Sequence, residues 1–374
     1  MSKQAPSPFT NHHDAYSMKQ EDKEVWLLNG MRQLTEWHRE RCMEYARFLL
    51  GSGADNNHIQ RLDQLPYLPT SIFKKFDLLS VDPEQHSKLK TVQSSSTSSG
   101  VPSRIFQDEA TSYRQKKSVQ SIFDSFLGTE RRPYIIFDAM ETARGKNSMS
   151  ARGAAIMSLM GYASRFYFVM DLCDGQLVLN EERLIEAVEA AKESGDFIAY
   201  GFTYILYQAH EVMQRQGHSF EGFGNQTFLI HSGGWKKLQN IAVDKGSFND
   251  AVSSVWNISP VQVIDFYGLV EQTGVIYPDC PHGNKHVPYY ADVIIRDPHT
   301  LQALPTGEVG LIQLMNLLPL ASPNHSVITD DMGKIVGVDD CPCGRRGKAF
   351  QFAGRAPKAE VRGCGDVYAE EQGK

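Results

Sequence analysis

Strand-like runs alternate with helical patterns along the middle of this chain, and this alternation constrains the fold more than any other feature. Runs rich in branched and aromatic residues cover 132–138, 165–171, 197–200, 226–231 and 261–267. Apolar residues recur at helical spacing over 111–126, 181–192, 205–216 and 248–253. Because strands separated by helices are joined by crossover connections, the pattern predicts the α/β class, with a mostly parallel sheet covered by helices.

The pattern changes after Gly268, where shorter β-like segments follow at 289–296, 308–314 and 334–338. These segments predict a smaller β-rich subdomain. The first residues are rich in Ser, Pro and His, which is typical of a flexible arm. The predicted organisation is an N-terminal arm at 1–18, an α/β core at 19–275, a β-rich subdomain at 276–353 and a C-terminal tail at 354–374.

Composition excludes several classes of protein. The 374 residues carry 44 Asp+Glu and 38 Lys+Arg, a net charge of −6, which argues against a nucleic-acid binder with a broad basic surface. No apolar run approaches the roughly 18 residues of a membrane span, and the N-terminus lacks the layout of a signal peptide. Six cysteines are too few for a disulfide scaffold and fit a reducing compartment. We therefore expect a cytoplasmic protein without a nucleic-acid partner.

A run of six hydroxyl residues, Ser94–Ser99, precedes Gly100 between strand-like segments at 89–93 and 104–107. Backbone N–H groups and hydroxyls in such a loop can follow phosphate oxygens, and glycine permits close approach. The loop is not a Walker A motif, because no G-x-x-x-x-G-K-[ST] occurs. On the residues alone, a phosphate loop and a Ser-rich linker both remain open.

Two further motifs follow strand-like runs, His231–Lys237 with a Gly-Gly pair and Phe266–Glu271 with a Tyr-Gly pair. The carboxyl ends of parallel strands face the ligand crevice, so a glutamate there can hold Mg²⁺ and a Tyr-Gly pair can present a ring and bare backbone. Thr329–Gly333 and Gly354-Arg355 add a carboxylate and a guanidinium that can share a ribose or phosphate. Taken singly, turn chemistry explains the Gly-Gly pair equally well, and an ordinary strand end with a solvated glutamate is the better explanation of Phe266–Glu271.

Two short cysteine motifs, 280–282 and 341–343, give a C-x-H…C-x-C set with ligands suited to Zn²⁺. His286 is a rival for the histidine position, or lines an acyl pocket instead. Free, unligated thiols remain the alternative. Cys42 and Cys173 lie in apolar patterns and are predicted to fill the core. The predicted ligands of a structural Zn²⁺ are Cys280, His282, Cys341 and Cys343.

In their order along the chain, these motifs resemble the motif series of acyl-adenylate-forming enzymes. Within that superfamily, Leu68–Lys74, His231–Lys237 and Lys285–Pro288 resemble the acyl-protein synthetases, the long-chain fatty acid–luciferin-component ligases. The similarity runs from about Leu62 to Tyr368. It implies the fold of the large N-terminal domain of the adenylate-forming enzymes, without their C-terminal lysine-bearing domain.

The resemblance implies how ATP would be bound. The family often has a lysine directly after the loop glycine; Val101 stands there in this chain, so Arg104 is the nearest cation for the phosphates. Gly233 and Gly234 would line the adenine and acyl pocket, and Tyr267 would stack on the base beside Gly268. The residues that would cradle the ATP phosphates are Ser95, Thr97, Ser98, Ser99 and Gly100.

The resemblance also implies a catalytic set. Glu271 would hold Mg²⁺, Asp331 would bind the ribose hydroxyls and Arg355 would contact ribose or phosphate. Cys364 lies between two glycines near Arg362, where positive charge and access favour a reactive thiolate, and it matches the family's acyl-accepting cysteine.

The sequence thus predicts ATP- and Mg²⁺-dependent activation of a fatty or other hydrophobic carboxylic acid to an acyl-AMP, followed by transfer to Cys364 or a partner protein. An acyl-acceptor or reductase protein is the expected partner. The segment 341–346 looks closer to phenylacetate–CoA ligases, so transfer to CoA or a carrier protein is the first alternative. A non-catalytic, adenylate-binding scaffold subunit is the second.

Overall fold

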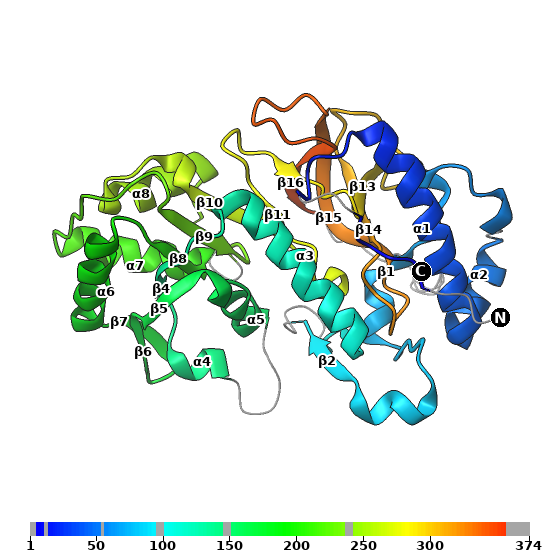
Figure 1. The fold of residues 1–374 in the computed structure, drawn as a ribbon, viewed down its shortest axis with the longest axis horizontal. Helices are drawn as coiled ribbons and strands as arrows, with labels where there is room; N and C mark the ends of the chain where they lie inside the picture. Colours follow the sequence, from blue (N-terminus) through cyan, green and yellow to red (C-terminus); the bar gives the residue numbers. More distant parts are fainter. Residues whose placement is uncertain are drawn as a thin grey trace, which may run out of the picture.

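The computed structural model describes residues 5–10, 14–53, 56–94, 101–144, 151–235 and 242–356. Two six-stranded sheets organise these residues, and Figure 1 shows them side by side with helix α3 (Glu109–Leu127) between them. None of the helices in the described part of the chain is long and apolar enough to cross a membrane.

The first sheet has the strand order β11-β10-β9-β8-β4-β5, and all of its strands except the edge strand β11 run parallel. Every residue of β4 and β8 is buried, as expected for strands covered on both faces. The predicted α/β class is therefore confirmed. The strands are β4 (Arg132–Ile136), β5 (Ala163–Phe168), β8 (Ile198–Phe202), β9 (Phe228–Ser232), β10 (Val263–Tyr267) and β11 (Tyr277–Pro278).

The helices around this sheet begin at polar caps. The side chains of Asp108, Asn180 and Asp244 each accept a hydrogen bond from a backbone N–H in the first turn of α3, α6 and α8. Aromatic residues, with Trp256 fully buried among them, complete the core. The helices are α4 (Met140–Arg144), α5 (Ala151–Ser158), α6 (Glu181–Ser194), α7 (Thr203–Arg215) and α8 (Lys245–Trp256).

One predicted strand, 165–171, is divided in the structure. Strand β5 ends at Phe168, and the chain then forms a separate hairpin of β6 (Met170–Cys173) and β7 (Gln176–Leu179). Its two-residue turn, Asp174-Gly175, has positive φ at both residues, the conformation that Asp-Gly turns favour. Cys173 is exposed on this hairpin, so its predicted place in the core is wrong.

The second sheet is antiparallel, with the order β12-β16-β15-β14-β13, and β1 adds a parallel edge to β15. Its strands β13, β14 and β15 overlap the predicted β-like segments at 289–296, 308–314 and 334–338, while β12 and β16 were not among them. The short hairpin β2–β3 lies apart from both sheets. These strands are β1 (Leu68–Pro69), β2 (Lys90–Gln93), β3 (Arg104–Gln107), β12 (Lys285–His286), β13 (Ala291–Arg296), β14 (Gly310–Asn316), β15 (Ser326–Val338) and β16 (Lys348–Arg355).

The N-terminal helices α1 (Gln20–Arg41) and α2 (Met43–Ser52) pack with this second sheet rather than with the parallel one. Leu27 and Met31 contribute to a buried cluster with β13 and β14, and the Lys23 ammonium lies 3.2 Å from the buried Asp292 carboxylate. The predicted core at 19–275 therefore groups α1 and α2 with the parallel sheet, although both helices pack against the antiparallel sheet.

The start of the chain also differs from the predicted flexible arm. Ala15 and Tyr16 are buried in the core of the second sheet, and the N–H of Arg346 donates to the Tyr16 carbonyl at 2.8 Å. Residues 14–18 are therefore a packed segment. The remaining short elements are 3-10 helices: η1 (Asn56–His58), η2 (Leu62–Gln64), η3 (Thr70–Lys74), η4 (Pro83–Lys88), η5 (Met160–Tyr162), η7 (Pro260–Gln262) and η8 (Val270–Gln272).

Candidate active site and cysteine–histidine cluster

Glu271 lies just beyond β10, on the one-turn helix η8, and is 7% exposed. An amide network fixes this turn, because Asn324 donates to the Glu271 carbonyl at 2.7 Å and Gln272 donates to the Asn324 carbonyl. Burial raises the pKa of the Glu271 carboxyl, while the nearby Ser103 hydroxyl and Lys74 ammonium oppose that rise. The turn therefore holds a buried carboxylate whose charged form gains from a nearby cation.

Tyr267, at the end of β10, contacts the second sheet. Its hydroxyl donates to the Asp331 carboxylate at 2.8 Å, and the Arg355 guanidinium lies 3.4 Å from the same carboxylate. Burial raises the pKa of Asp331, and the contacts with Tyr267 and Arg355 oppose the rise. The ring of Tyr267 also stacks on Phe352 of β16, with centroids 5.4 Å apart. Residues predicted from distant motifs therefore meet at one place.

Asp331 and Arg355 face each other because β15 and β16 pair in that register. Gly354, directly before Arg355, has φ 103°, a backbone conformation that favours glycine. The Arg355 side chain is 73% exposed. The guanidinium is thus held at the surface beside a partly buried carboxylate, where a ligand can reach both groups.

The Ser-rich loop begins and ends beside this group. Ser94 and Ser103 close its base: the N–H of Ser94 donates to the Ser103 carbonyl at 3.2 Å, and the N–H of Ser103 donates to the Ser94 hydroxyl at 2.9 Å. Ser103 is fully buried and lies near Glu271. The predicted phosphate-binding residues themselves, Ser95, Thr97, Ser98, Ser99 and Gly100, lie outside the described residues.

Gly233 and Gly234 follow β9, which pairs with β10 and so ends at the same edge of the sheet as Tyr267. Their φ angles are 86° and 59°, and a side chain at Gly233 would contact the ring of Phe202. Both positions therefore favour glycine and leave the backbone exposed. Gly268, after Tyr267, is also exposed.

Two cations lie near the loop, and they differ in their partners. Arg104, the sequence's candidate for the ATP phosphates, forms an ion pair with Asp77, with Nε and Oδ1 2.7 Å apart. Lys74 ends η3, which lies against both β3 and β15, and its charge acts on Glu271. Lys74 is the residue that the sequence argument missed, although it lies inside a quoted motif; no local pattern relates it to Glu271, which is far away in the chain.

His231 is a buried side chain next to the Gly-Gly turn. Its Nδ1 lies 3.0 Å from the Thr203 hydroxyl and 3.7 Å from the Asp265 carboxylate, and burial lowers its pKa to about 4. Lys285 in turn lies 2.8 Å from the Asp265 carboxylate. These contacts fix the ends of β9 and β10 and bring β12 against them.

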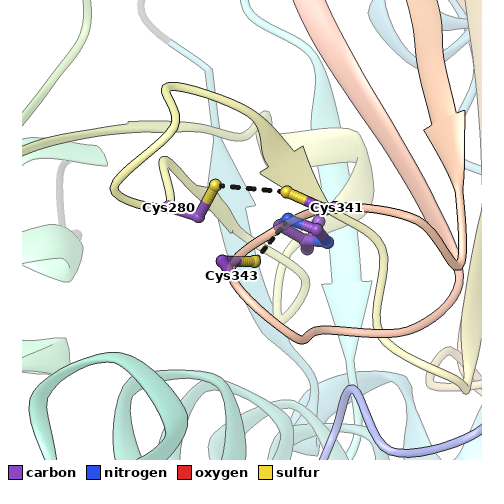
Figure 2. Close-up of side chains that lie close together, drawn as sticks. Cys280, Cys341 and Cys343 are labelled. Atoms are coloured by element: carbon purple, nitrogen blue, oxygen red, sulfur yellow. Dashed lines mark hydrogen bonds between the residues drawn. The ribbon is translucent and has the colours of Figure 1, made fainter.

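The cysteine motifs meet in a cluster where the chain passes from β11 to β12. The ligand atoms of Cys280, His286, Cys341 and Cys343 all lie within 4.8 Å of one another. Figure 2 shows Cys280 and Cys341 facing each other with Cys343 beside them; the first two sulfurs are 3.9 Å apart, and Cys343 Sγ is 3.2 Å from His286 Nε2. None of these three cysteines forms a disulfide.

His282, one of the four predicted metal ligands, is not in this cluster; its rival His286 takes that place. His282 lies in the turn closed by the hydrogen bond from Gly283 N–H to the Cys280 carbonyl, and its side chain is exposed. His286 is fully buried because it lies on β12, paired with Ala349 of β16. The predicted acyl acceptor Cys364 lies outside the described residues.

The acyl-protein synthetase LuxE family matches residues 10–372, so the chain belongs to this family, whose members are acyl-adenylate-forming ligases. Long-chain-fatty-acid–luciferin-component ligases are curated relatives. That of Vibrio harveyi is 27% identical over 91% of this chain and 88% of its own length, and that of Aliivibrio fischeri is 24% identical over 89% and 85%.

Solved structures show the same fold at low sequence identity. An open conformation of 2-hydroxyisobutyryl-CoA ligase, in complex with 2-HIB-AMP and CoA, has a TM-score of 0.67 at 13% identity, covering 96% of this chain and 82% of that chain. The same ligase in its postadenylation state gives 0.66 at 13% identity, covering 94% and 72%. The predicted fold of an adenylate-forming enzyme is confirmed.

Proposed function

We propose that this protein joins a long-chain fatty acid, or another hydrophobic carboxylic acid, to ATP as an acyl-AMP and then passes the acyl group to a protein thiol. The observation that carries the proposal is the convergence of Tyr267, Glu271, Asp331 and Arg355 beside the base of the Ser-rich loop. The names of the two curated relatives support a fatty acid as the substrate.

In the first step, an oxygen of the substrate carboxylate attacks the α-phosphorus of ATP, and the bond to the bridging oxygen breaks to release pyrophosphate. The residues around the site bind and orient rather than bond covalently. Asp331 would accept hydrogen bonds from the ribose hydroxyls, and Arg355 would donate to ribose or phosphate. Tyr267, fixed by Asp331 and Phe352, would present its ring to the base.

Mg²⁺ fits Glu271, because this carboxylate is 7% exposed and its charged form is disfavoured by burial unless a cation is near. The ion would neutralise charge on the departing pyrophosphate. Lys74 would add a second positive charge close to Glu271. This assignment gives the cationic role to Lys74 rather than to Arg104 because the Lys74 charge acts on Glu271, the proposed Mg²⁺ ligand.

In the second step, a thiolate attacks the acyl carbonyl and AMP leaves, so a thioester forms. Cys364 is our proposed acceptor, by resemblance to the family and by its flanking glycines and nearby Arg362. A separate acceptor or reductase protein would then take the acyl group. The cofactors of the proposal are ATP and Mg²⁺ for the reaction and a structural Zn²⁺ at the cysteine–histidine cluster.

Exchange of labelled pyrophosphate into ATP tests the first step. We expect exchange that depends on a long-chain fatty acid; its absence with fatty, aromatic and short-chain acids alike would favour the scaffold alternative.

Labelled acid and ATP test the second step. Cys364→Ser should keep exchange and lose the hydroxylamine-sensitive protein label, while Cys173→Ser, an exposed thiol elsewhere, should keep both. Label that persists in Cys364→Ser rules out this acceptor, and CoA-dependent release of AMP favours a CoA ligase.

A further inference from the structure

The geometry points to a closed Zn²⁺ site made by Cys280, His286, Cys341 and Cys343, which joins the segment that crosses between the two sheets to the β15–β16 turn. The inference gives the zinc part of the proposed function its ligands and its structural role. It does not depend on the acyl-transfer part.

Two distances between the ligand atoms suit a tetrahedral ion. Two thiolates at ~2.3 Å from a tetrahedral zinc lie ~3.8 Å apart, and a thiolate and an imidazole nitrogen lie ~3.5 Å apart. The Cys280 and Cys341 sulfurs are 3.9 Å apart, and Cys343 Sγ is 3.2 Å from His286 Nε2. A disulfide needs about 2.05 Å between sulfurs, so the cluster has the spacing of metal ligands rather than of a bridge.

Two matching turns present the first cysteine of each motif. Both have the sequence Cys-Pro-x-Gly, at 280–283 and 341–344. In both, the glycine N–H donates to the cysteine carbonyl, at 2.8 and 3.0 Å, and the glycine has φ of 71° and 84°. Two parts of the chain that are far apart in sequence thus use the same turn to present a cysteine to one cluster. Free thiols that met by chance would not need matching turns, whereas ligands of one metal ion would.

Amide donors surround the sulfurs. The backbone N–H groups of His282 and Asn284 point toward the Cys280 sulfur, and that of Cys343 points toward the Cys341 sulfur. The Asn284 side chain also donates to Cys341 Sγ at 3.7 Å and is itself held by Gln351 at 3.0 Å. Such donors stabilise the negative sulfur of a metal-bound thiolate.

Three sulfurs and one imidazole fill all four positions of a tetrahedral ion, which makes the site structural rather than catalytic. The segment between the motifs explains what it would stabilise. Strand β11 pairs with β10 of the parallel sheet, and β12 pairs with β16 of the antiparallel sheet. The turn at 339–347 also reaches α3, where Arg345 donates to the Ser125 carbonyl at 2.7 Å. A metal here would fasten the junction of the two sheets.

Metal content of the full-length chain, purified under reducing conditions, tests the site directly. We expect about one zinc and no iron per chain. His286→Ala and Cys341→Ser should lose zinc, while the matched controls His282→Ala and Cys173→Ser should keep it. Loss of zinc in His282→Ala together with retention in His286→Ala would overturn the ligand set, and iron in place of zinc would overturn the metal.

Reconstitution covers the case in which a ligand variant fails to fold. The wild-type chain, stripped with a chelator and given Co²⁺, should gain the visible absorption of tetrahedral cobalt thiolate, and added Zn²⁺ should abolish it. Zinc should also raise the Tm by roughly 5 °C, because it binds the folded chain preferentially. A chain that holds no zinc, shows no cobalt absorption and keeps its Tm after chelation contradicts the site.

Pyrophosphate exchange on the same preparations separates the two proposals. Zinc without exchange would contradict acid activation and leave the metal site standing. Exchange in a chain that holds no zinc would contradict the metal site and leave acid activation standing.

Discussion

The β15–β16 hairpin carries parts of two sites that differ in their chemistry. At the strand end, Asp331 and Arg355 lie beside Tyr267, and Glu271 lies close by. At the turn, Cys341 and Cys343 meet two ligands from the segment that follows β11. One hairpin therefore connects the proposed nucleotide site to the proposed metal site.

The difference lies in what each site has left to bind. The cysteine–histidine cluster can satisfy a metal with its own four ligand atoms and has no free coordination position. At the other end, burial raises the pKa of both Glu271 and Asp331, so their charges are incompletely compensated by the protein. A metal site with all four positions filled by protein ligands can only stabilise the fold. The carboxylates of Glu271 and Asp331, in contrast, gain from binding a cation or a ligand that donates hydrogen bonds. This contrast predicts that the two ends respond independently to mutation.

The largest effect is expected from Glu271→Gln. Loss of the carboxylate removes the proposed Mg²⁺ ligand, so pyrophosphate exchange should fall about 10²- to 10³-fold, the usual size for a lost electrostatic contact in a reacting site. Zinc content should not change. The control is Glu308→Gln, an exposed acid on the β13–β14 connection, which should keep full exchange. Near-normal exchange in Glu271→Gln would show that this carboxylate does not hold the Mg²⁺ of the reaction, and the proposed difference between the two ends of the hairpin would fail.

Asp331→Asn should have the next largest effect. The amide cannot accept charge-assisted hydrogen bonds from ribose, a loss of about 1.5–3 kcal/mol, so the KM for ATP should rise about 10- to 100-fold. Asp330→Asn is the matched control, because this neighbour is exposed and should change the KM by less than about two-fold. Equal effects of the two substitutions would mean that Asp331 acts only through general charge.

The sequence predicted most of the parallel sheet because its signals are local: apolar runs and helical spacing. The order of the motifs also placed Tyr267, Glu271, Asp331 and Arg355 in one site. The structure brings these four residues together, and their roles stay predictions. The sequence favoured His282 over His286 as the histidine of the cysteine cluster. Both lie within six residues of Cys280, and only the pairing of β12 with β16 buries His286 and brings it into the cluster.

The same reasoning explains the other errors. Packing of residues 14–18 and of α1 depends on contacts with residues hundreds of positions away, such as Tyr289 and Asp292. No local pattern contains such contacts. Cys173 is exposed because it ends β6, directly before the Asp-Gly turn of a hairpin that lies outside the parallel sheet.

Lys74→Met should have a smaller effect than either carboxylate substitution. The Lys74 charge acts on Glu271 from outside the buried turn, so its loss should lower exchange about 5- to 10-fold, or roughly 1 kcal/mol. Lys88→Met, an exposed lysine at the end of η4, should leave exchange unchanged. If Arg104→Met lowered exchange far more than Lys74→Met, the cationic role would return to Arg104 and its pair with Asp77 would have to open during the reaction.

The smallest expected effect is on thermal stability, where Glu271→Gln should raise the Tm although it lowers pyrophosphate exchange. Burial raises the pKa of Glu271 in the folded chain above its unfolded value, so folding favours the protonated carboxyl. That contribution is complete below the unfolded pKa and is lost as the pH rises through the folded pKa, which leaves a destabilising charge at neutral pH. Neutral Glu271→Gln should therefore raise the Tm by roughly 1–3 °C at pH 7.5 in the absence of Mg²⁺ and ATP, and by less at pH 4. Ligand variants of the metal cluster should lower the Tm under the same conditions. A fall of Tm in Glu271→Gln at pH 7.5 would show that this carboxylate is part of the fold's own polar network, and the contrast between the two ends of the hairpin would then fail.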